Sequence, residues 1–471
     1  MATQAKYSFH TEPFPQEERP RRFLEAFAAV LQHSNYGPVL DYYTRVSAKC
    51  SRCTATCPVY QASGDPRDIP CHRTELLLAV YRRYFTFSGQ LKARLYDSSR
   101  LTDAAIDEMA EEFWRCTACK RCKSSCPMGL DHAMITHLAR WIMAEIGIVP
   151  KALLVSVREQ LEGRTHNTSA IPVSAMTDTC EFLEEELQEL FPGHPITFPI
   201  DVPEADYVFF PAVSDYLLEA DTLMGNAAVL YAIGAKWTIG TGNFDGINYG
   251  LFYSDRMWER IIRAQVAEIK RLGGKVMLIG ECGHASRSAK EGMQCFIPPE
   301  ERVPVLNIME LTHAAFKAGT LRLNPGVIAE RTTYHDPCNI ASNGWIVDQP
   351  RELLRHICAD FVEMTPRGTD NYCCGGGGGS VSIDEIKRFR MYIGGKTKAE
   401  QVRATGAKYV VTPCANCKKQ MGELLDEHKV DCTRIGLHDL LLKAIELGPL
   451  PAGEGTTDKG PAEQRPEVEG A

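Results

Sequence analysis

The sequence predicts an α-helical domain followed by two duplicated α/β lobes. Apolar residues recur at helical spacing through the first 150 positions, whereas short apolar runs alternate with helical segments from residue 206 onward. These runs repeat at a nearly constant offset, which indicates an internal duplication. The chain has 471 residues, 44% of them apolar, and is therefore long enough for two or three domains with cores of their own.

The helical domain is expected to cover residues 1–150. Its helices are expected over 23–31, 76–85 and 135–146, where apolar side chains recur every three or four positions. These segments flank two runs of cysteines. The domain is therefore expected to hold whatever the cysteines bind.

A connector and a tail are expected on either side of the lobes. Residues 151–205 combine an acidic helix over 181–190 with several prolines, and we expect them to connect the helical domain to the first lobe. Residues 451–471 contain few apolar side chains, and we expect a disordered tail there.

The repeat divides the remaining chain into lobes at 206–320 and 321–450. Three pairs of segments match at offsets of 126, 132 and 129 residues: 207–212 with 333–338, 276–282 with 410–414, and 308–311 with 437–440. Short strands alternate with helices in both lobes, which predicts mainly parallel sheets.

The most specific motif is a cysteine run closed by a proline: Cys116, Cys119, Cys122, Cys126 and Pro127. Three thiolates this close together can bind three corners of one [4Fe-4S] cube, while the fourth turns toward a second cluster, as in bacterial two-cluster ferredoxins. Structural zinc sites take two ligands from a loop and gain nothing from a third, so zinc is the weaker interpretation. The run predicts a ferredoxin-like domain that transfers electrons.

A second run upstream keeps three of these cysteines and the proline. Cys50, Cys53 and Cys57 precede Pro58, but Ser47 stands where the first cysteine is expected. Serine is a poor ligand for iron, so Cys71, the nearest spare thiol, is the candidate eighth ligand. Cys71 as a free buried thiol is the alternative.

Eight cysteines suffice for two [4Fe-4S] cubanes. With crossed fourth ligands, the first cluster takes Cys116, Cys119, Cys122 and Cys57. The second cluster takes Cys50, Cys53, Cys126 and Cys71.

Composition excludes several classes of protein. No run approaches the 18 apolar residues of a membrane-spanning helix, and the N-terminus lacks the apolar core of a signal peptide. The chain has eighteen cysteines, gathered largely into metal-type spacings, and this pattern without a secretory signal indicates a reducing cytoplasm. The net charge of −8, with both signs interspersed, gives no electrostatic footprint for nucleic acid.

The second lobe carries five more cysteines in a pattern: Cys338, Cys373, Cys374, Cys414 and Cys417. Each group follows an expected strand, and ligand sites in open α/β sheets collect at the carboxyl ends of strands. The glycines at 375–379 would let backbone approach an inorganic core and donate N–H groups to its sulfides. A flexible glycine linker is the alternative.

These five cysteines resemble the cysteine-rich CCG motif of heterodisulfide reductases. In that family the motif binds a noncubane [4Fe-4S] cluster at which a disulfide is cleaved. Two cubane motifs followed by duplicated CCG-type lobes are also the layout of the D-type subunit of heterodisulfide reductase, so the resemblance covers residues 40–447. It implies that the five second-lobe cysteines are ligands at the catalytic cluster.

The first lobe departs from this pattern. Four positions where the motif requires cysteine hold other residues, Ala212, Phe244, Asp245 and Ala285, and Cys282 alone remains. We therefore expect one noncubane cluster instead of two. A degenerate first lobe is similar to the DsrK-type subunits of the Dsr, Hmc and Tmc membrane complexes.

The resemblance implies a cytoplasmic subunit on the cytoplasmic face of the inner membrane, docked on a membrane cytochrome or quinone-reactive subunit. Electrons would pass through the two cubanes to the noncubane site. That site would reduce or form a disulfide or trisulfide, with a DsrC-like protein as the carrier.

A second interpretation is an electron-relay subunit of a flavin-dependent dehydrogenase for glycolate, lactate or glycerol 3-phosphate. Residues 53–61 are similar to the glycolate oxidase iron–sulfur subunit. In that case the chain performs no substrate chemistry. No dinucleotide-binding fingerprint is present, so any flavin would lie on another subunit.

Several residues near the motifs have two interpretations. His284 and His335 are candidate proton donors or structural histidines, and Cys282 is a candidate extra ligand or substrate-contacting thiol. Cations beside the second-lobe motif form a basic collar for an acidic partner or are ordinary solvated charges: Lys387, Arg388, Arg390, Lys418 and Lys419. Four cysteines lie in no ligand spacing and are expected to be free: Cys180, Cys295, Cys358 and Cys432.

Overall fold

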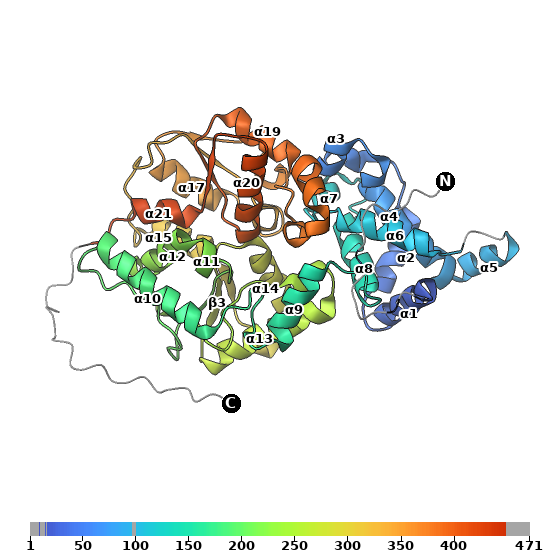
Figure 1. The fold of residues 1–471 in the computed structure, drawn as a ribbon, viewed down its shortest axis with the longest axis horizontal. Coiled ribbons are helices and arrows are strands. Elements are labelled where there is room, and N and C mark those ends of the chain that lie inside the picture. Colours follow the sequence, from blue (N-terminus) through green and yellow to red (C-terminus); the bar gives the residue numbers. More distant parts are fainter. Residues whose placement is uncertain (1–8, 10–14, 16, 97–99, 449–471) are drawn as a thin grey trace.

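The computed structural model describes residues 9, 15, 17–96 and 100–448. The helical domain occupies one end of the molecule, and two α/β lobes lie one above the other at the opposite end (Figure 1). The expected tail at 451–471 lies outside the described residues.

The helical domain contains eight α-helices among its described residues: α1 (Arg19–Gln32), α2 (Tyr36–Val46), α3 (Pro58–Ser63), α4 (Pro70–Phe85), α5 (Phe87–Leu95), α6 (Asp103–Trp114), α7 (Arg121–Ser125) and α8 (His132–Ala144). The three helices expected from apolar periodicity correspond to α1, α4 and α8, and that prediction is confirmed. Proline or an aspartate cap fixes where several of these helices begin. Pro58 and Pro70 stand at the first positions of α3 and α4. The side chain of Asp131 accepts hydrogen bonds from two backbone amides at the start of α8.

Two long helices follow, α9 (Lys151–Glu162) and α10 (Val173–Leu190). The acidic helix expected over 181–190 begins eight residues earlier, at Val173. Its buried side includes Met176, Cys180 and Leu183, and α10 packs on the first lobe. The segment at 151–205 is therefore packed structure and not an extended linker.

Each lobe has a four-stranded parallel sheet with the same strand order. The first sheet is β2-β1-β3-β4 and the second is β6-β5-β7-β8. Their strands are β1 (Tyr207–Phe210), β2 (Trp237–Thr238), β3 (Val276–Ile279), β4 (Val305–Asn307), β5 (Thr332–Tyr334), β6 (Phe361–Val362), β7 (Tyr409–Val411) and β8 (Thr433–Ile435). The parallel sheets expected from the alternation of strands and helices are confirmed, and the shared order is what a duplication would produce.

Helices surround both sheets. In the first lobe these are α11 (Asp215–Leu218), α12 (Ala220–Ala232), α13 (Asp255–Arg271), α14 (Gly283–Phe296) and α15 (Ile308–Ala318). In the second lobe they are α16 (Cys338–Ala341), α17 (Asp348–Ile357), α18 (Lys387–Phe389), α19 (Lys396–Thr405), α20 (Ala415–Glu427) and α21 (Leu437–Ala444).

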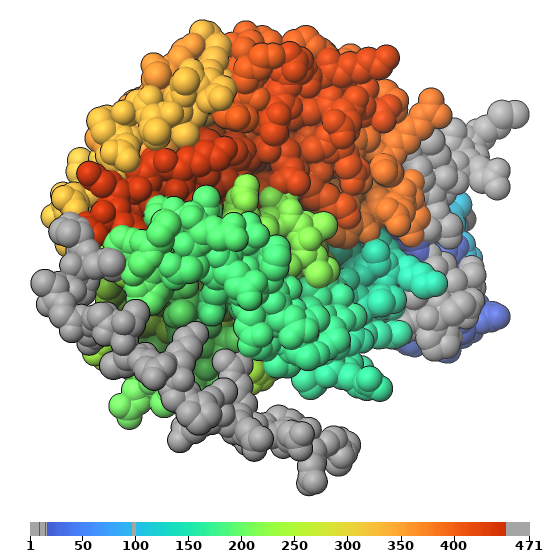
Figure 2. Space-filling model, turned by 60° about the vertical axis from the view of Figure 1, so that its left-hand side comes forward, coloured from blue at the N-terminus to red at the C-terminus, as the bar shows by residue number. Residues whose placement is uncertain are grey.

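The two lobes pack directly on each other. Helix α12 lies against α21, and a Cβ at Gly225 would lie 2.1 Å from the carbonyl oxygen of His438. In the space-filling view the green segments of the first lobe press against the red segments of the second (Figure 2). Glycine at this position permits the close approach of the two lobes. The approach brings the carboxyl ends of the two sheets, where ligand sites form in α/β folds, toward one another.

Candidate functional site

One group of thiols joins the two cysteine runs of the helical domain. Cys57 lies at the N-cap of α3 and Cys122 lies within α7. Burial, and then the nearby thiols of Cys119, Cys116 and Cys57, raise the pKa of Cys122 well above its ordinary value. The structure thus brings together the first predicted set of four.

The second predicted set lines one pocket. Cys50, Cys53, Cys71 and Cys126 all face this hollow, and Ser47 lines it as well. Interaction with the neighbouring thiol of Cys53 lowers the pKa of Cys71 to about 6. Cys50 is exposed, so this group lies at the surface of the helical domain.

The five cysteines of the second lobe converge in the interior. Cys338 begins α16 after strand β5, and Cys414 is the N-cap of α20 after strand β7. The Sγ atoms of Cys374 and Cys417 are 3.4 Å apart. Cys373 contacts the thiols of both Cys338 and Cys374. All five are buried, so five soft ligands share one water-poor site at the carboxyl ends of the strands.

A sixth thiol comes from the first lobe. Cys282 follows β3 and caps α14, as Cys414 follows β7 and caps α20. The thiols of Cys282 and Cys414 shift each other's pKa in opposite directions, that of Cys282 upward and that of Cys414 downward. The surviving first-lobe cysteine therefore faces the second-lobe group across the lobe interface.

His284 orients this thiol. Its Nδ1 lies 3.3 Å from Sγ of Cys282, and its Nε2 accepts from the amide of Asn248 at 3.4 Å. A neutral ring that accepts at Nε2 carries its proton on Nδ1. Two groups adjoin this Nδ1, the Sγ of Cys282 and the side-chain Nδ2 of Asn416, which lies 3.1 Å away. Burial lowers the pKa of His284 to about 4, and the ring is neutral at pH 7.

His335 faces the same group from β5. Its ring nitrogen lies within 4.8 Å of the Sγ atoms of Cys374 and Cys417. Among the described residues, none forms a hydrogen bond with either ring nitrogen, although the side chain is fully buried. Buried polar groups are normally partnered, and a sulfur-rich cluster would supply a partner here. Burial lowers the pKa of His335 to about 3, so the neutral imidazole is the form at pH 7.

The second-lobe thiols adjoin the first set of the helical domain. The thiol of Cys119 interacts with those of Cys338 and Cys373, and Cys373 also contacts Thr117. The glycine run makes this approach possible, because a Cβ at Gly377 would lie 2.5 Å from the carbonyl oxygen of Thr117. These glycines therefore allow two segments of backbone to meet between the thiol groups.

Arg140 of α8 binds backbone segments on both sides of the boundary between the first thiol set and the second-lobe thiols. Its guanidinium donates to the carbonyl oxygens of Phe113 at 2.8 Å, Cys116 at 2.7 Å and Gly378 at 2.7 Å. The side chain is 1% exposed. Burial lowers its pKa to about 10, which still leaves it charged at pH 7.

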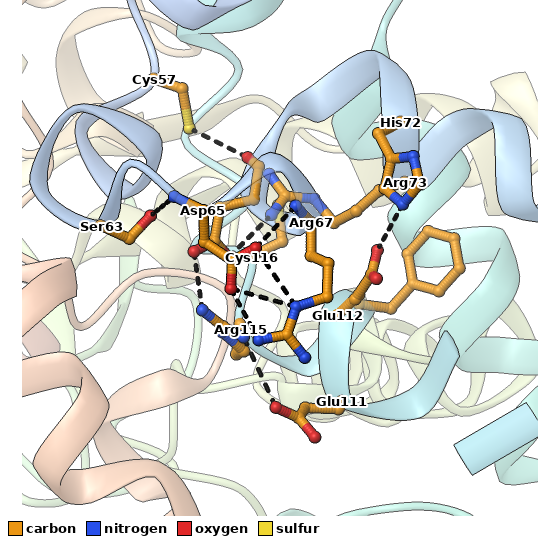
Figure 3. Close-up of polar contacts among 12 residues, drawn as sticks. Cys57, Ser63, Asp65, Arg67, His72, Arg73, Glu111, Glu112, Arg115 and Cys116 are labelled. Carbon is orange, nitrogen blue, oxygen red and sulfur yellow. Dashed lines mark hydrogen bonds and ion pairs between the residues drawn. The ribbon is translucent and has the colours of Figure 1, made fainter. Parts of the chain in front are cut away.

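Buried charges lie behind the first thiol set (Figure 3). Arg73 interacts electrostatically with the thiols of Cys57 and Cys116, and Arg115 donates to Asp68 at 2.6 Å. Glu112 is 1% exposed, and Nε2 of His72 lies 3.6 Å from its Oε2, beyond hydrogen-bonding distance (Figure 3). Burial raises the pKa of Glu112 to about 8.

Both interpretations of the cations beside the second-lobe motif, a basic collar and ordinary solvated charges, are wrong for two of these residues. Lys418 is fully buried, and its Nζ donates to Oγ1 of Thr222 at 2.6 Å. Arg390 is also buried and pairs with Glu423 at 2.7 Å. The sequence around both cations is typical of an exposed helix. Their burial could not be predicted from it, because the segments that cover them are distant along the chain.

Sequence reasoning also missed Arg140, Arg73 and Thr117. Arg140 did leave a signal, since it is the single charge within the apolar run at 138–144. A lone arginine on a buried helix face must find acceptors. Nothing local marks Arg73 or Thr117, because their partners are distant in sequence.

The comparisons with known families agree with the two cysteine-bearing regions. The 4Fe-4S dicluster domain family matches residues 48–130, and the cysteine-rich CCG domain family matches residues 332–422. The first match contains both thiol sets of the helical domain. The second contains all five second-lobe cysteines.

Several known proteins are similar to most of the chain. An Hdr-like menaquinol oxidoreductase iron-sulfur subunit from Archaeoglobus profundus is 26% identical, covering 90% of this chain and 83% of its own. The D-type subunit of the dihydromethanophenazine:CoB–CoM heterodisulfide reductase of Methanosarcina barkeri is 24% identical, covering 85% and 93%. An EtfAB:quinone oxidoreductase from Syntrophomonas wolfei is 20% identical, covering 78% and 53%.

The resemblance to iron–sulfur proteins of this kind, with a CCG domain, is confirmed. The thiol groups of the chain also fit the chemistry of iron–sulfur clusters, since soft thiolates select iron–sulfur centres and the grouped sites exclude most water. Among the residues that the structure describes, no helix is long and apolar enough to cross a membrane.

Proposed function

We propose that this heterodisulfide reductase D-like chain is the iron–sulfur subunit of a membrane-associated redox complex. It carries two [4Fe-4S] cubanes, bound by the two crossed cysteine sets, and one noncubane [4Fe-4S] cluster bound by Cys338, Cys373, Cys374, Cys414 and Cys417. The noncubane site reduces or forms a disulfide or trisulfide on a DsrC-like carrier protein.

The proximity of the first thiol set to the second-lobe thiols carries this proposal. Cys119 interacts electrostatically with Cys338 and Cys373, and Arg140 bridges the carbonyl oxygens of Cys116 and Gly378, so a cubane held by the first set would lie near the noncubane site. The exposed Cys50 belongs to the other set. Electrons would therefore enter or leave at the surface cubane and reach the buried site through the inner one.

Cleavage of one S–S bond consumes two electrons and two protons and yields two thiols. The noncubane cluster, when bound, supplies an iron-rich centre to which sulfur can bind while electrons arrive one at a time. The chain contributes the surroundings: Cys414 stands at the N-cap position of α20, and interaction with the thiols of Cys282 and Cys417 holds its pKa well below its ordinary value, which favours the thiolate. Nδ1 of His284 lies 3.3 Å from Sγ of Cys282.

The membrane partner is proposed to be a cytochrome or quinone-reactive subunit on the cytoplasmic face of the inner membrane. Two of the relatives are named for menaquinol and dihydromethanophenazine, which supports an exchange of electrons with a lipid-soluble carrier. A flavin-dependent relay is the second candidate, and co-purification with a flavoprotein instead of a haem-bearing subunit would support it.

The test is electron paramagnetic resonance on the anaerobically purified chain, with iron counted on the same sample. We expect interacting cubane signals after reduction with dithionite, and a separate signal after oxidation with a thiol present. Cys373→Ala should remove the second signal and about four irons. Cys358→Ala, which alters a buried cysteine outside every group, should change neither. Cubane signals alone, unchanged in Cys373→Ala, would contradict the disulfide site and leave an electron relay.

A further inference from the structure

Helix α5 presents its large apolar side chains to solvent. Phe87 is 84% exposed, Leu95 is 66% exposed, and Leu91 and the following Tyr96 are exposed as well. None of its own nine residues is buried. The helix projects from the end of the helical domain that lies farthest from the two lobes (Figure 1).

The orientation of α5 is the reverse of that of an ordinary surface helix. Phe87, Leu91 and Leu95 are four residues apart and share one face. Gly89 and Ala93 occupy the opposite face, and a Cβ at Gly89 would lie 1.6 Å from the carbonyl oxygen of Arg82. The small residues thus face α4, and the large apolar residues point away from the protein.

The charge of α5 itself has one sign. The helix carries Lys92 and Arg94 and no acidic residue, although the chain has a net charge of −8. Arg82 of the preceding helix is paired with Glu75. Lys92 and Arg94 are exposed on either side of the apolar stripe. Long basic side chains that flank exposed apolar residues are typical of helices that lie in a membrane interface, where the cations meet anionic headgroups.

We propose that α5 inserts its exposed apolar face into the surface of an anionic lipid bilayer, so that this chain touches the membrane itself. The inference rests on the proposed membrane-associated complex and adds a lipid contact to its protein contacts. Two features favour lipid as the occupant: the two basic residues of α5, which complement anionic headgroups, and the large apolar side chains that α5 exposes to solvent.

The bilayer contact also orients the chain. Helix α4 holds Cys71 in its first turn and ends beside α5, and its 16 residues span about 24 Å. The surface thiol set would therefore stand about one helix length above the lipid, and the buried second-lobe site would lie farther away. In this orientation the surface thiol set lies nearer the membrane than the second-lobe site, so electrons from a membrane carrier would reach the surface set first.

The test is flotation of the full-length, cluster-loaded chain with vesicles of phosphatidylcholine, with or without phosphatidylglycerol. We expect binding to the anionic vesicles. The double variant Phe87→Ser/Leu95→Ser should lower the partition coefficient about 10- to 100-fold, because two apolar side chains no longer enter the interface. Lys92→Gln and Arg94→Gln should each lower it about fivefold on anionic vesicles and have little effect on neutral ones.

Phe182→Ser provides the matched control. Phe182 is 56% exposed on α10, which is acidic and lies away from α5 (Figure 1), so this variant should bind vesicles as the parent chain does. Cys373→Ala should also bind normally, which separates this proposal from that of the noncubane site.

Two results would overturn the proposal. One is a parent chain that does not float with anionic vesicles, and the other is a Phe87→Ser/Leu95→Ser variant that floats as well as the parent. If the parent does not bind lipid but the double variant is released from its membrane subunit, α5 docks on protein instead.

Discussion

Arg140 donates a hydrogen bond from Nη1 to the carbonyl oxygen of Gly378, at 2.7 Å, and thereby ties the glycine run of the second lobe to a helix of the helical domain. The same guanidinium holds the carbonyl of Cys116. One buried cation thus fixes the distance between a cubane cysteine and the segment that follows Cys373 and Cys374.

Arg140→Gln should weaken the junction between the two thiol groups. The loss leaves buried carbonyls without a donor, which should lower stability by about 3–5 kcal/mol and slow electron transfer to the second-lobe site. The measurement is the thermal midpoint, together with single-turnover reoxidation of the cubanes by a disulfide. Arg260→Gln, at an exposed pair with Glu162, is the control and should change neither. Unaltered reoxidation in Arg140→Gln would show that the link does not set the rate.

Gly377→Ala should push the second-lobe thiols away from the first thiol set of the helical domain through a steric clash. Its Cβ would lie 2.5 Å from the carbonyl of Thr117 and 3.3 Å from Sγ of Cys373, so backbone must move. We expect loss of the noncubane signal while the cubane signals persist, measured by paramagnetic resonance with iron counted.

Gly422→Ala is the matched control for this substitution. Gly422 lies in α20, and its Cβ would be 3.7 Å from the nearest atom. Alanine there should stabilise the helix by about 0.5–1 kcal/mol and leave every signal in place. A normal noncubane signal in Gly377→Ala would mean that the backbone at Gly377 and Thr117 can move apart without loss of the cluster.

Cys282→Ser should perturb the noncubane site without removing it. The first-lobe thiol faces Cys414, whereas the five second-lobe cysteines remain available as ligands. We expect a shifted oxidised signal, a full iron count and a decrease of about tenfold or more in disulfide turnover. Cys180→Ser, another buried thiol outside the site, should behave as the parent. If Cys282→Ser instead loses about four irons, Cys282 is a required ligand.

Cys71→Ser tests the eighth cubane ligand. Cys71 shares a pocket with Cys50, Cys53 and Cys126, and serine binds iron poorly. We expect a loss of one to four irons and of the magnetic interaction between the reduced cubanes, with the noncubane signal retained. A full iron count with unchanged spectra would return Cys71 to the role of a free thiol.

Glu112→Gln should alter the dependence of stability on pH. Burial raises the pKa of Glu112 to about 8, above its value in the unfolded chain, so the folded state retains a proton that the unfolded state loses. Stability from this group is therefore complete below about pH 4.5 and declines as the pH rises to about 8. The glutamine variant lacks this decline and should exceed the parent by on the order of 1–4 kcal/mol at pH 8–9.

Thermal midpoints between pH 5 and pH 9 measure this difference. Glu186→Gln, at an exposed position of α10 far from Glu112, is the control and should follow the parent. Parallel curves for Glu112→Gln and the parent would mean that Glu112 is ionised in the folded protein.

The sequence by itself determined the helical domain, the two parallel α/β lobes and the division of thirteen cysteines into groups. Periodicity specified α1, α4 and α8 because one face of each helix must be apolar. Cysteine spacing indicated iron–sulfur chemistry because several soft ligands within a short loop can reach one cluster. Both signals are local, and they need no knowledge of the partner.

Only the tertiary structure decided which residues, distant in the sequence, lie next to one another. Lys418 and Arg390 resemble surface charges in the sequence, yet packing of the lobes buries them. Cys282 appears isolated in the sequence, yet the lobe interface turns it toward Cys414. Arg140 and Gly378 are 238 residues apart, and no local pattern encodes their contact. Such pairings depend on the free energy of burying whole surfaces against one another, which no short segment of sequence specifies.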